Sequence, residues 1–348
     1  MENEKETIRV SIVGAGENTR KMHIPGLQAI PGVEIVGVAN RRRESAGRVA
    51  GEFGIPTVYN TWESLVSAQD SDAIVIGTWP YLHCPVTLTA LDAGKHVLCE
   101  ARMAMDAAEA REMLAVSQRY PDLVAQVVPS PMTLGVDQTV SRLVKEGFLG
   151  RLFAVEVRDY AGAFVDEDAP MHWRQDVRLS GKNVMTLGIW YEAVMRWVGG
   201  AKNVMAKGQV NVGQRLDGDS GELSEVEVPD HLVVVADMEC GAQATFQVSQ
   251  VVGGVQAGEV VLSGSEGTLK VCDGRLYGIQ RGESGFQEIP VPEKERGGWR
   301  VEEEFIRAIR GEEVVTHTTF ADGVSYMEFT DAVARSMADG RVVDVAKV

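Results

Sequence analysis

The chain has 348 residues, of which 45% are hydrophobic and 24% charged, and its formal net charge is -16 at pH 7. This composition is that of an ordinary globular protein, and the length predicts two domains. The negative charge argues against binding to nucleic acid or to an anionic membrane surface, because both would repel it. The sequence shows neither an export signal nor a bilayer-spanning apolar run, and its four cysteines are scattered. We therefore expect a cytoplasmic protein with reduced thiols.

The first third of the chain alternates short β-branched runs with helical patterns, which predicts a parallel sheet covered by helices. The expected strands are residues 9–13, 34–39, 73–76, 96–99 and 123–127. The expected helices are residues 21–29, 43–53, 61–67, 84–93 and 106–120. This alternation is typical of a doubly wound α/β (Rossmann) domain, which we place at residues 1–126.

The pattern changes in the remainder of the chain. The expected helices there are residues 136–146, 184–198, 301–309 and 320–337. The expected strands are residues 152–160, 232–239, 243–250, 259–263 and 268–272. Consecutive strands without helices between them indicate an antiparallel sheet, and the polar segment 214–227 is expected to be an exposed loop. We therefore expect an α+β C-terminal domain at residues 127–348, with a large, mostly antiparallel open sheet.

A glycine-rich turn follows the first expected strand. Four candidate cofactor contacts, Gly14, Gly16, Glu17 and Asn18, stand between this strand and the next helix. Such glycines allow a tight turn and close approach of a pyrophosphate to the amino terminus of a helix. Thr19 replaces the third glycine of the usual motif. The alternative is a turn that binds no ligand. The position of this motif at the start of several strand-helix units instead favours a dinucleotide site.

Basic residues follow the second expected strand, where an NAD-selective site normally has a carboxylate for the ribose. The sequence there reads Val38-Ala39-Asn40-Arg41-Arg42-Arg43, and the first carboxylate is Glu44. Because arginine can bind a 2′-phosphate through two parallel hydrogen bonds, the sequence favours NADP over NAD, with Asn40 and Arg41 as contacts. The alternative is that these arginines form the solvated start of a helix.

Several segments resemble the Gfo/Idh/MocA family of oxidoreductases. Residues 94–104 read Gly-Lys-His-Val-Leu-Cys-Glu-Ala-Arg-Met-Ala and are similar to a family segment that ends in Glu-Lys-Pro. Residues 76–85 resemble the family stretch beside the nicotinamide, and further similarity lies in 180–197, 263–269 and 304–311. The resemblance covers nearly the whole chain and implies NAD(P) as cofactor. It also implies substrate binding by the second domain, whose open sheet would form a homodimer or homotetramer.

The resemblance implies further cofactor contacts for four residues. They are Thr78, His83, Glu100 and Arg102.

The same resemblance implies that the family's catalytic groups are absent. Ala101 stands where the family has lysine, Thr186 where it has aspartate, and Trp190 where it has histidine. Hydride transfer from a hydroxyl-bearing carbon still requires a group that takes the hydroxyl proton. Lys182 would lie one turn before Thr186 on the same helix face and can act as a base if it is desolvated. The alternatives are that Lys182 is exposed and that Tyr191, water or the substrate itself takes the proton.

Four residues are candidates for substrate binding. Trp190 can stack on a sugar ring or fill the core, and Thr186 is its neighbour one turn away. Trp173 and Arg174 resemble a family loop that precedes this helix; packing by Trp173 beside a surface Arg174 is the alternative.

Three functions are compatible with these patterns. The preferred one is an NAD(P)-dependent oxidoreductase acting on a CH–OH group of a sugar, polyol or related carbohydrate, because the cofactor and pocket segments are retained. The second is an enzyme that uses bound nicotinamide transiently for lyase, hydrolase or epimerase chemistry. The third is a non-catalytic relative that binds nucleotide or sugar. No metal site is expected.

Overall fold

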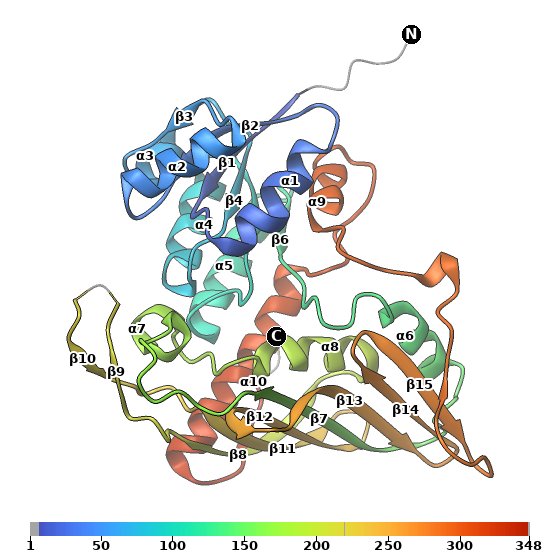
Figure 1. Ribbon diagram of the computed structural model, residues 1–348. Helices are drawn as coiled ribbons and strands as arrows, with labels where there is room; N and C mark the ends of the chain where they lie inside the picture. The colour runs from blue at the N-terminus through green and yellow to red at the C-terminus, as the bar shows by residue number, and fades with distance from the viewer. Residues whose placement is uncertain (1–6, 219, 347–348) are drawn as a thin grey trace. The chain divides into compact units, whose positions relative to one another are not determined.

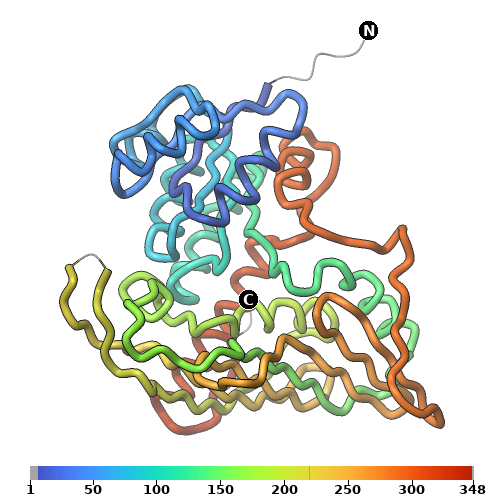
Figure 2. Tube along the Cα trace, viewed as in Figure 1, coloured from blue at the N-terminus to red at the C-terminus, as the bar shows by residue number. Residues whose placement is uncertain are grey.

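The computed structural model describes residues 7–218 and 220–346. These residues form two compact units, and Figure 1 and Figure 2 trace the chain through both. The first unit contains the chain up to Pro129 together with Arg300–Val324, and the second contains Ser130–Trp299 together with the residues from Ser325 onward. The two continuous ranges expected from the sequence differ from this division mainly in the placement of residues 300–324.

A six-stranded sheet forms the centre of the first unit, in the order β3-β2-β1-β4-β5-β6. Its neighbouring strands are all parallel, as the alternation of strands and helices predicts. The strands are β1 Ile8–Val13, β2 Val33–Ala39, β3 Thr57–Val58, β4 Ala73–Ile76, β5 His96–Cys99 and β6 Ala125–Val127. The strand order switches direction between β1 and β4, and in such sheets ligands bind at the carboxyl ends of these two strands.

Helices follow the strands of this sheet. They are η1 Thr19–His23, α1 Ile24–Gln28, α2 Arg43–Phe53, α3 Trp62–Ser67, η2 Pro80–Leu82, α4 His83–Asp92, α5 Ala107–Arg119 and α9 Val301–Ile309. Local chemistry fixes their ends. The Asp106 carboxylate accepts hydrogen bonds from the N–H groups of Ala108 and Glu109 at 2.9 and 3.1 Å, which caps α5. Gly54 ends α2 with a φ of 70°, a conformation that favours glycine.

Residues 300–324 complete the edge of the first unit's sheet. Val127 in the edge strand β6 and Thr318 exchange two backbone hydrogen bonds, at 2.9 and 3.1 Å. The helix α9 packs beside α1 (Figure 1). An edge strand presents unpaired backbone N–H and C=O groups. Residues 300–324 therefore supply hydrogen-bond partners for backbone groups of β6 that residues 7–129 leave unpaired.

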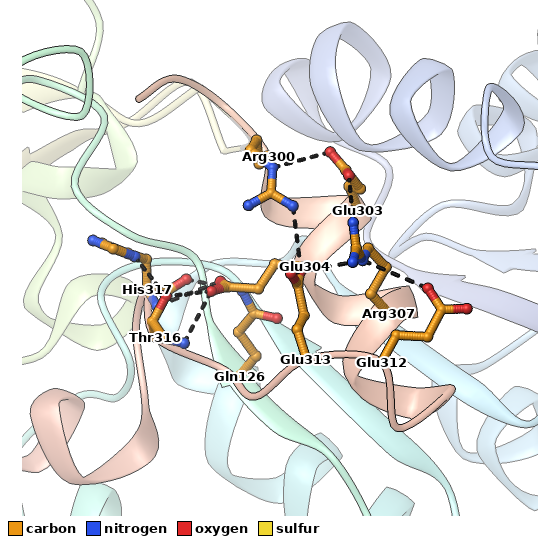
Figure 3. Close-up of polar contacts among 9 residues, drawn as sticks. All are labelled: Gln126, Arg300, Glu303, Glu304, Arg307, Glu312, Glu313, Thr316 and His317. Atoms are coloured by element: carbon orange, nitrogen blue, oxygen red, sulfur yellow. Dashed lines mark hydrogen bonds and ion pairs between the residues drawn. The ribbon is translucent and has the colours of Figure 1, made fainter. Parts of the chain in front are cut away.

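Polar contacts attach α9 to the same strand (Figure 3). The buried Glu304 carboxylate accepts a hydrogen bond from Gln126 Nε2 at 2.9 Å, and others from Thr316 N and Oγ1 at 2.9 and 2.6 Å. These donors compensate the burial of its charge. On the exposed side of the helix, Arg300 and Arg307 form ion pairs with the carboxylates of Glu303, Glu312 and Glu313.

A nine-stranded sheet forms the second unit, in the order β16-β15-β14-β13-β7-β12-β11-β8-β17. Only β7 and β12 pair in parallel among these described strands, so the sheet is mostly antiparallel, as expected. The strands are β7 Leu152–Gly162, β8 Ala201–Gln209, β11 His231–Met238, β12 Gln243–Gly253, β13 Gln256–Gly264, β14 Gly267–Cys272, β15 Arg275–Gln280, β16 Gln287–Glu288 and β17 Val343–Asp344.

Two helices, α8 (Leu187–Val198) and α10 (Phe320–Asp339), pack on one face of this sheet. The stacked rings of Tyr191 from α8 and Phe329 from α10 have centroids 3.7 Å apart, and both rings contact Phe246 of β12. The remaining helices of this unit are shorter. The helical elements are α6 Asp137–Lys145, η3 Trp173–Gln175, α7 Val177–Ser180, α8 Leu187–Val198, η4 Glu293–Glu295 and α10 Phe320–Asp339, the last of which belongs to this unit from Ser325 onward.

Two local expectations for the second unit are wrong. Part of the expected loop 214–227 forms an antiparallel ribbon, because β9 Gln214–Leu216 pairs with β10 Leu223–Glu225. The helix α8 begins at Leu187, after positive φ values of 63° at Gly181 and 45° at Met185. These conformations interrupt a helix, so Lys182 lies before α8 and does not share a helix face with Trp190.

None of the helices within the described part of the chain has the length and hydropathy of a membrane span.

Candidate functional site

A cleft of about 620 Å³ lies in the first unit, beside the carboxyl ends of β1, β2 and β4. It therefore occupies the switch point of the sheet. Five of the residues predicted to contact a cofactor line it: Gly14, Gly16, Asn40, Arg41 and Thr78.

Packing explains why the turn after β1 requires glycine. Gly14 has a φ of 85°, and a Cβ added to it would lie 2.5 Å from Thr78 Cγ2. A Cβ on Gly77 would lie 2.0 Å from Thr19 Oγ1. Thr19, the residue in place of the third glycine, thus fits because position 77 at the end of β4 has no side chain. The threonine hydroxyl also donates to the Gly14 carbonyl, at 3.2 Å.

The Asn40 side chain shapes the cleft from the end of β2. Its Oδ1 accepts a hydrogen bond from the N–H of Ala15 at 2.7 Å, and its Nδ2 donates to Ser45 Oγ at 3.0 Å. The amide therefore joins the glycine-rich turn to the first turn of α2. A carboxylate at this position could accept from Ala15 but could not donate to Ser45 as the amide does.

Arginine side chains make this part of the cleft cationic. Arg41, Arg42 and Arg48 line it, whereas its described lining contains no aspartate or glutamate. The Arg41 guanidinium lies over the Trp79 ring, 5.5 Å from its centroid. Arg43 is not among the lining residues and donates to Val58 O and to Asn60 Oδ1. Two of the three consecutive arginines thus face the cleft, although all three are exposed.

His83, a predicted cofactor contact, is fully buried and is not among the residues that line the cleft. Its ring nitrogens lie 2.9 Å from the Arg102 carbonyl and 3.0 Å from the Thr78 carbonyl. Burial lowers the pKa of His83, so the neutral ring donates to one of these two carbonyls. His83 therefore positions the backbone that carries Thr78. The Arg102 side chain is also buried, with 1% of its surface exposed.

A buried ionic cluster lies behind the glycine-rich turn. His23 Nε2 is 3.0 Å from Glu100 Oε1, and His23 Nδ1 is 2.5 Å from Glu302 Oε1. Asn18 Nδ2 donates to the same Glu100 oxygen, and the N–H of Ala101 donates to Oε2 at 3.1 Å. The predicted contacts Asn18 and Glu100 are thus hydrogen-bonded to each other. Glu17, in contrast, is exposed and pairs with Lys21 at 2.6 Å.

Opposing effects set the protonation of this cluster. Burial alone would lower the pKa of His23, but hydrogen bonds and charge from Glu100 and Glu302 outweigh burial and raise the pKa to about 9. Burial would raise the pKa of Glu100, but the donors His23, Asn18 and Ala101 lower it overall. At neutral pH the His23 ring is therefore an imidazolium, which contacts the carboxyl groups of Glu100 and Glu302.

A second cavity, of about 650 Å³, lies in the second unit near the ends of β7 and β13. Trp190 from α8 and Asp159 from β7 both line it. Trp190 is 3% exposed, and its indole Nε1 has no hydrogen-bond partner among the described residues. A Cβ on Gly258 would lie 3.9 Å from Trp190 Cζ2, in ordinary contact with the ring.

Asp159 is a site residue that the sequence analysis missed. The hydroxyl of Thr186, the residue immediately before α8, donates a hydrogen bond to the Asp159 carboxylate. The signal that identifies this carboxylate is strand periodicity: residues two apart share a face. Asp159 follows Val155 and Val157, both buried on the face toward α8.

The two proposed proton acceptors from the sequence lie elsewhere in the second unit. Lys182 Nζ forms a 2.7 Å ion pair with Asp331, and its side chain is 42% exposed. Tyr191 is buried against Phe329, and its hydroxyl oxygen accepts from the N–H of Ala201 at 2.9 Å. Burial raises the pKa of Tyr191 to about 12. Neither residue lines the cavity beside Trp190.

The predicted substrate contacts Trp173 and Arg174 form their own pair in the short helix η3. The Arg174 guanidinium lies 4.2 Å from the centroid of the Trp173 ring, a cation–π contact. Both side chains are partly exposed, and neither lines the cavity. Across the described residues, no group of three or more His, Cys, Asp or Glu side chains is arranged to hold a metal ion.

Known proteins match both halves of the chain. Residues 8–127 match a family model described as an oxidoreductase family with NAD-binding Rossmann fold, and residues 138–270 match the GFO/IDH/MocA C-terminal domain. An uncharacterized oxidoreductase from Synechocystis sp. is 24% identical over 300 residues, which are 82% of this chain and 79% of the relative. Glucose-fructose oxidoreductase domain-containing protein 2 from Mus musculus is 25% identical over 284 residues, or 81% and 71% of the two chains.

A solved structure has the same fold. Levoglucosan dehydrogenase in complex with NADH and L-sorbose matches 98% of this chain and 99% of its own, with a TM-score of 0.87 at 20% identity. The two family models together cover most of the sequence. The chain therefore belongs to the Gfo/Idh/MocA oxidoreductase family and has its NAD-binding Rossmann fold.

Proposed function

We propose that this protein is an NADP-dependent oxidoreductase that removes hydride from a hydroxyl-bearing carbon of a sugar or polyol. The observation that carries the proposal is the cationic cleft at the switch point of the first sheet, built on a turn that excludes side chains at Gly14. We assign the substrate to the cavity beside Trp190 in the second unit. The levoglucosan dehydrogenase structure with NADH and L-sorbose supports a carbohydrate as the substrate class.

The residues of the cleft fit a dinucleotide phosphate. The turn from Gly14 to Gly16 allows the backbone to approach a pyrophosphate. Arg41 and Arg42 would bind a 2′-phosphate, because charge-assisted hydrogen bonds from arginine match phosphate geometry. When bound, the nicotinamide supplies the hydride acceptor.

The preference for NADP over NAD rests on the lining of the cleft near β2. It contains the Arg41, Arg42 and Arg48 side chains and no described carboxylate that would repel a phosphate. The Asn40 amide already binds Ala15 and Ser45, so a ribose diol gains no acidic partner there. Hydrogen bonds to charged groups contribute about 1.5 to 3 kcal/mol, so we expect at least about tenfold tighter binding of NADPH than of NADH.

We also propose that the protein is a homodimer or homotetramer formed through the open face of the large sheet. Met205 of β8 and Val235 of β11 are partners in the strand register and are 42% and 36% exposed. Light scattering on the purified protein should give a mass that is a multiple of the chain's 37.8 kDa. The substitution Met205→Glu should shift that mass toward the single chain.

Two measurements test the proposed activity. Fluorescence titration gives the affinities for NADPH and NADH. The absorbance of reduced nicotinamide, followed with NADP and a panel of sugars and polyols, then reports turnover. Product formed without net change in absorbance would instead indicate transient use of the nicotinamide, and nucleotide binding without product from any compound would indicate a non-catalytic relative.

A further inference from the structure

Resting on the proposed function, we infer that Asp159 is the catalytic carboxylate that binds the reacting hydroxyl group, and that its cavity selects neutral polyols over anionic sugars. In the step that follows, the hydroxyl O–H bond breaks and its proton passes to an Asp159 oxygen. The same carbon would lose the hydride of its C–H bond, for which a bound oxidised nicotinamide would supply the acceptor, and its C–O bond would become a carbonyl. Asp159 later returns the proton to water.

The position of Asp159 is unusual for a carboxylate in a strand. It follows Val155 and Val157 on the face of β7 that packs toward α8, yet it lines a cavity and is only partly buried. Its register partner across β13 is Gly258, whose lack of a side chain places no group over it from that strand. The backbone therefore presents this carboxylate to a ligand of the cavity.

Hydrogen bonding leaves Asp159 able to receive a ligand. Among the described residues, the Thr186 hydroxyl donates a hydrogen bond to its carboxylate. A carboxylate has about four acceptor positions, so most of them are available to substrate hydroxyl groups. Its sequence neighbour Arg158 does not neutralise it, because Arg158 pairs with Glu259 at 2.7 Å. Thr186 fixes the orientation of the carboxylate without supplying a cation.

Trp190 supplies a second point of recognition in the same cavity. Its ring is almost fully buried, and its indole N–H has no acceptor in the described part of the structure. Buried donors are nearly always satisfied, so a substrate oxygen is a natural partner for this group. A polyhydroxyl compound carries both the donor that Asp159 accepts and the acceptor that Trp190 requires.

The charges around the cavity favour a neutral polyol over an anionic one. Three carboxylates line it, from Asp159, Glu259 and Asp273, against the single guanidinium of Arg158. Arg158 and Lys270 are both paired with Glu259. A phosphate or carboxylate on the substrate would face excess negative charge here, in a protein of net charge -16. The cavity therefore fits an uncharged sugar or polyol.

The test compares the wild type with Asp159→Asn and with the control Glu156→Gln, which removes a carboxylate from the exposed, opposite face of the same strand. Calorimetry measures the binding of D-glucose, myo-inositol and D-glucitol, and of the anionic D-glucose 6-phosphate and D-glucuronate, to the full-length proteins with NADPH present. We expect neutral compounds to bind more tightly than anionic ones. Asp159→Asn should weaken this binding by about tenfold and leave NADPH affinity unchanged. Glu156→Gln should match the wild type.

The possible results separate the inference from the proposed function. Unchanged polyol affinity in Asp159→Asn, tighter binding of the anionic compounds, or no binding of any polyol would overturn the inference. Polyol binding that depends on Asp159, without any change in nicotinamide absorbance, would refute the oxidoreductase proposal while leaving Asp159 as the ligand-binding carboxylate. With an active substrate, kcat/KM of Asp159→Asn should fall by about 100-fold or more. If Asp159→Asn destabilises the fold, Thr186→Val serves as the second variant, because valine is also β-branched and has a shape similar to threonine.

Discussion

The His23 cluster allows a quantitative prediction about stability. The pKa of His23 is raised from 6.5 to about 9 by Glu100 and Glu302, which outweigh the effect of burial. A difference of one pKa unit between the folded and unfolded states corresponds to about 1.36 kcal/mol. The cluster therefore contributes about 3 kcal/mol to the free energy of unfolding. Because the pKa is higher in the folded state than in the unfolded state, this contribution is complete below about pH 6.5 and is lost as the pH rises through about 9.

The substitution His23→Gln should remove this pH dependence. The glutamine amide can donate hydrogen bonds to both carboxylates but carries no charge. Urea denaturation of the full-length protein, at pH values from about 6 to about 10, measures the free energy of unfolding. We expect the wild type to exceed the variant by about 3 kcal/mol at the acidic end, with the difference closing toward the alkaline end.

A matched control separates this cluster from general titration. His231 is partly exposed, and its Nδ1 is hydrogen-bonded to Ser249 Oγ at 3.0 Å. His231→Gln removes a histidine outside the cluster, so it should leave the pH dependence that the cluster causes in place. The reasoning is refuted if His23→Gln and the wild type lose stability in parallel over this pH range.

Four further substitutions test the cleft and the residues that lie outside the cavity. Arg41→Ala should weaken NADPH binding by about tenfold or more and leave NADH binding nearly unchanged, as read from fluorescence titrations; equal losses for both nucleotides would contradict a phosphate contact. Gly14→Ala places a Cβ against Thr78 at a positive φ, so calorimetry should show loss of binding of both nucleotides. Tyr191→Phe leaves a buried backbone N–H without its acceptor and should destabilise the fold by about 1 to 3 kcal/mol. Lys182→Ala should change the free energy of unfolding by at most about 1 kcal/mol. Neither Tyr191→Phe nor Lys182→Ala should change kcat by more than about twofold. A large loss of kcat in either variant would show that the substituted residue takes part in proton transfer.

The fold of the first unit could be predicted because the sequence patterns that specify its strands and turns are local. Buried apolar runs at regular spacing mark parallel strands, and the turn at Gly14 follows the first of them. The placement of residues 300–324 could not be read in this way. It depends on the pairing of Val127 with Thr318 and of Gln126 with Glu304, contacts between residues that are far apart in the sequence.

The site in the second unit shows the limit of reasoning from one helix. The expected continuity from Lys182 to Trp190 failed because Gly181 and Met185 adopt positive φ values, and a non-glycine residue in that conformation is not apparent from periodicity. The neighbouring strand instead brings a carboxylate, that of Asp159, to Thr186, whose hydroxyl donates a hydrogen bond to it. Strand parity identifies such a carboxylate, whereas a search for replacements along the helix does not.

The return of residues 300–324 to the first unit has a consequence for biosynthesis. When the ribosome has released the first 129 residues, strand β6 still lacks Thr318 as its partner and His23 still lacks Glu302. At about 5 to 20 residues per second, the missing segment follows only after roughly ten seconds or more. During that interval the nascent nucleotide-binding unit carries an open sheet edge and an incomplete ionic cluster, so its final folding must wait for nearly the whole chain.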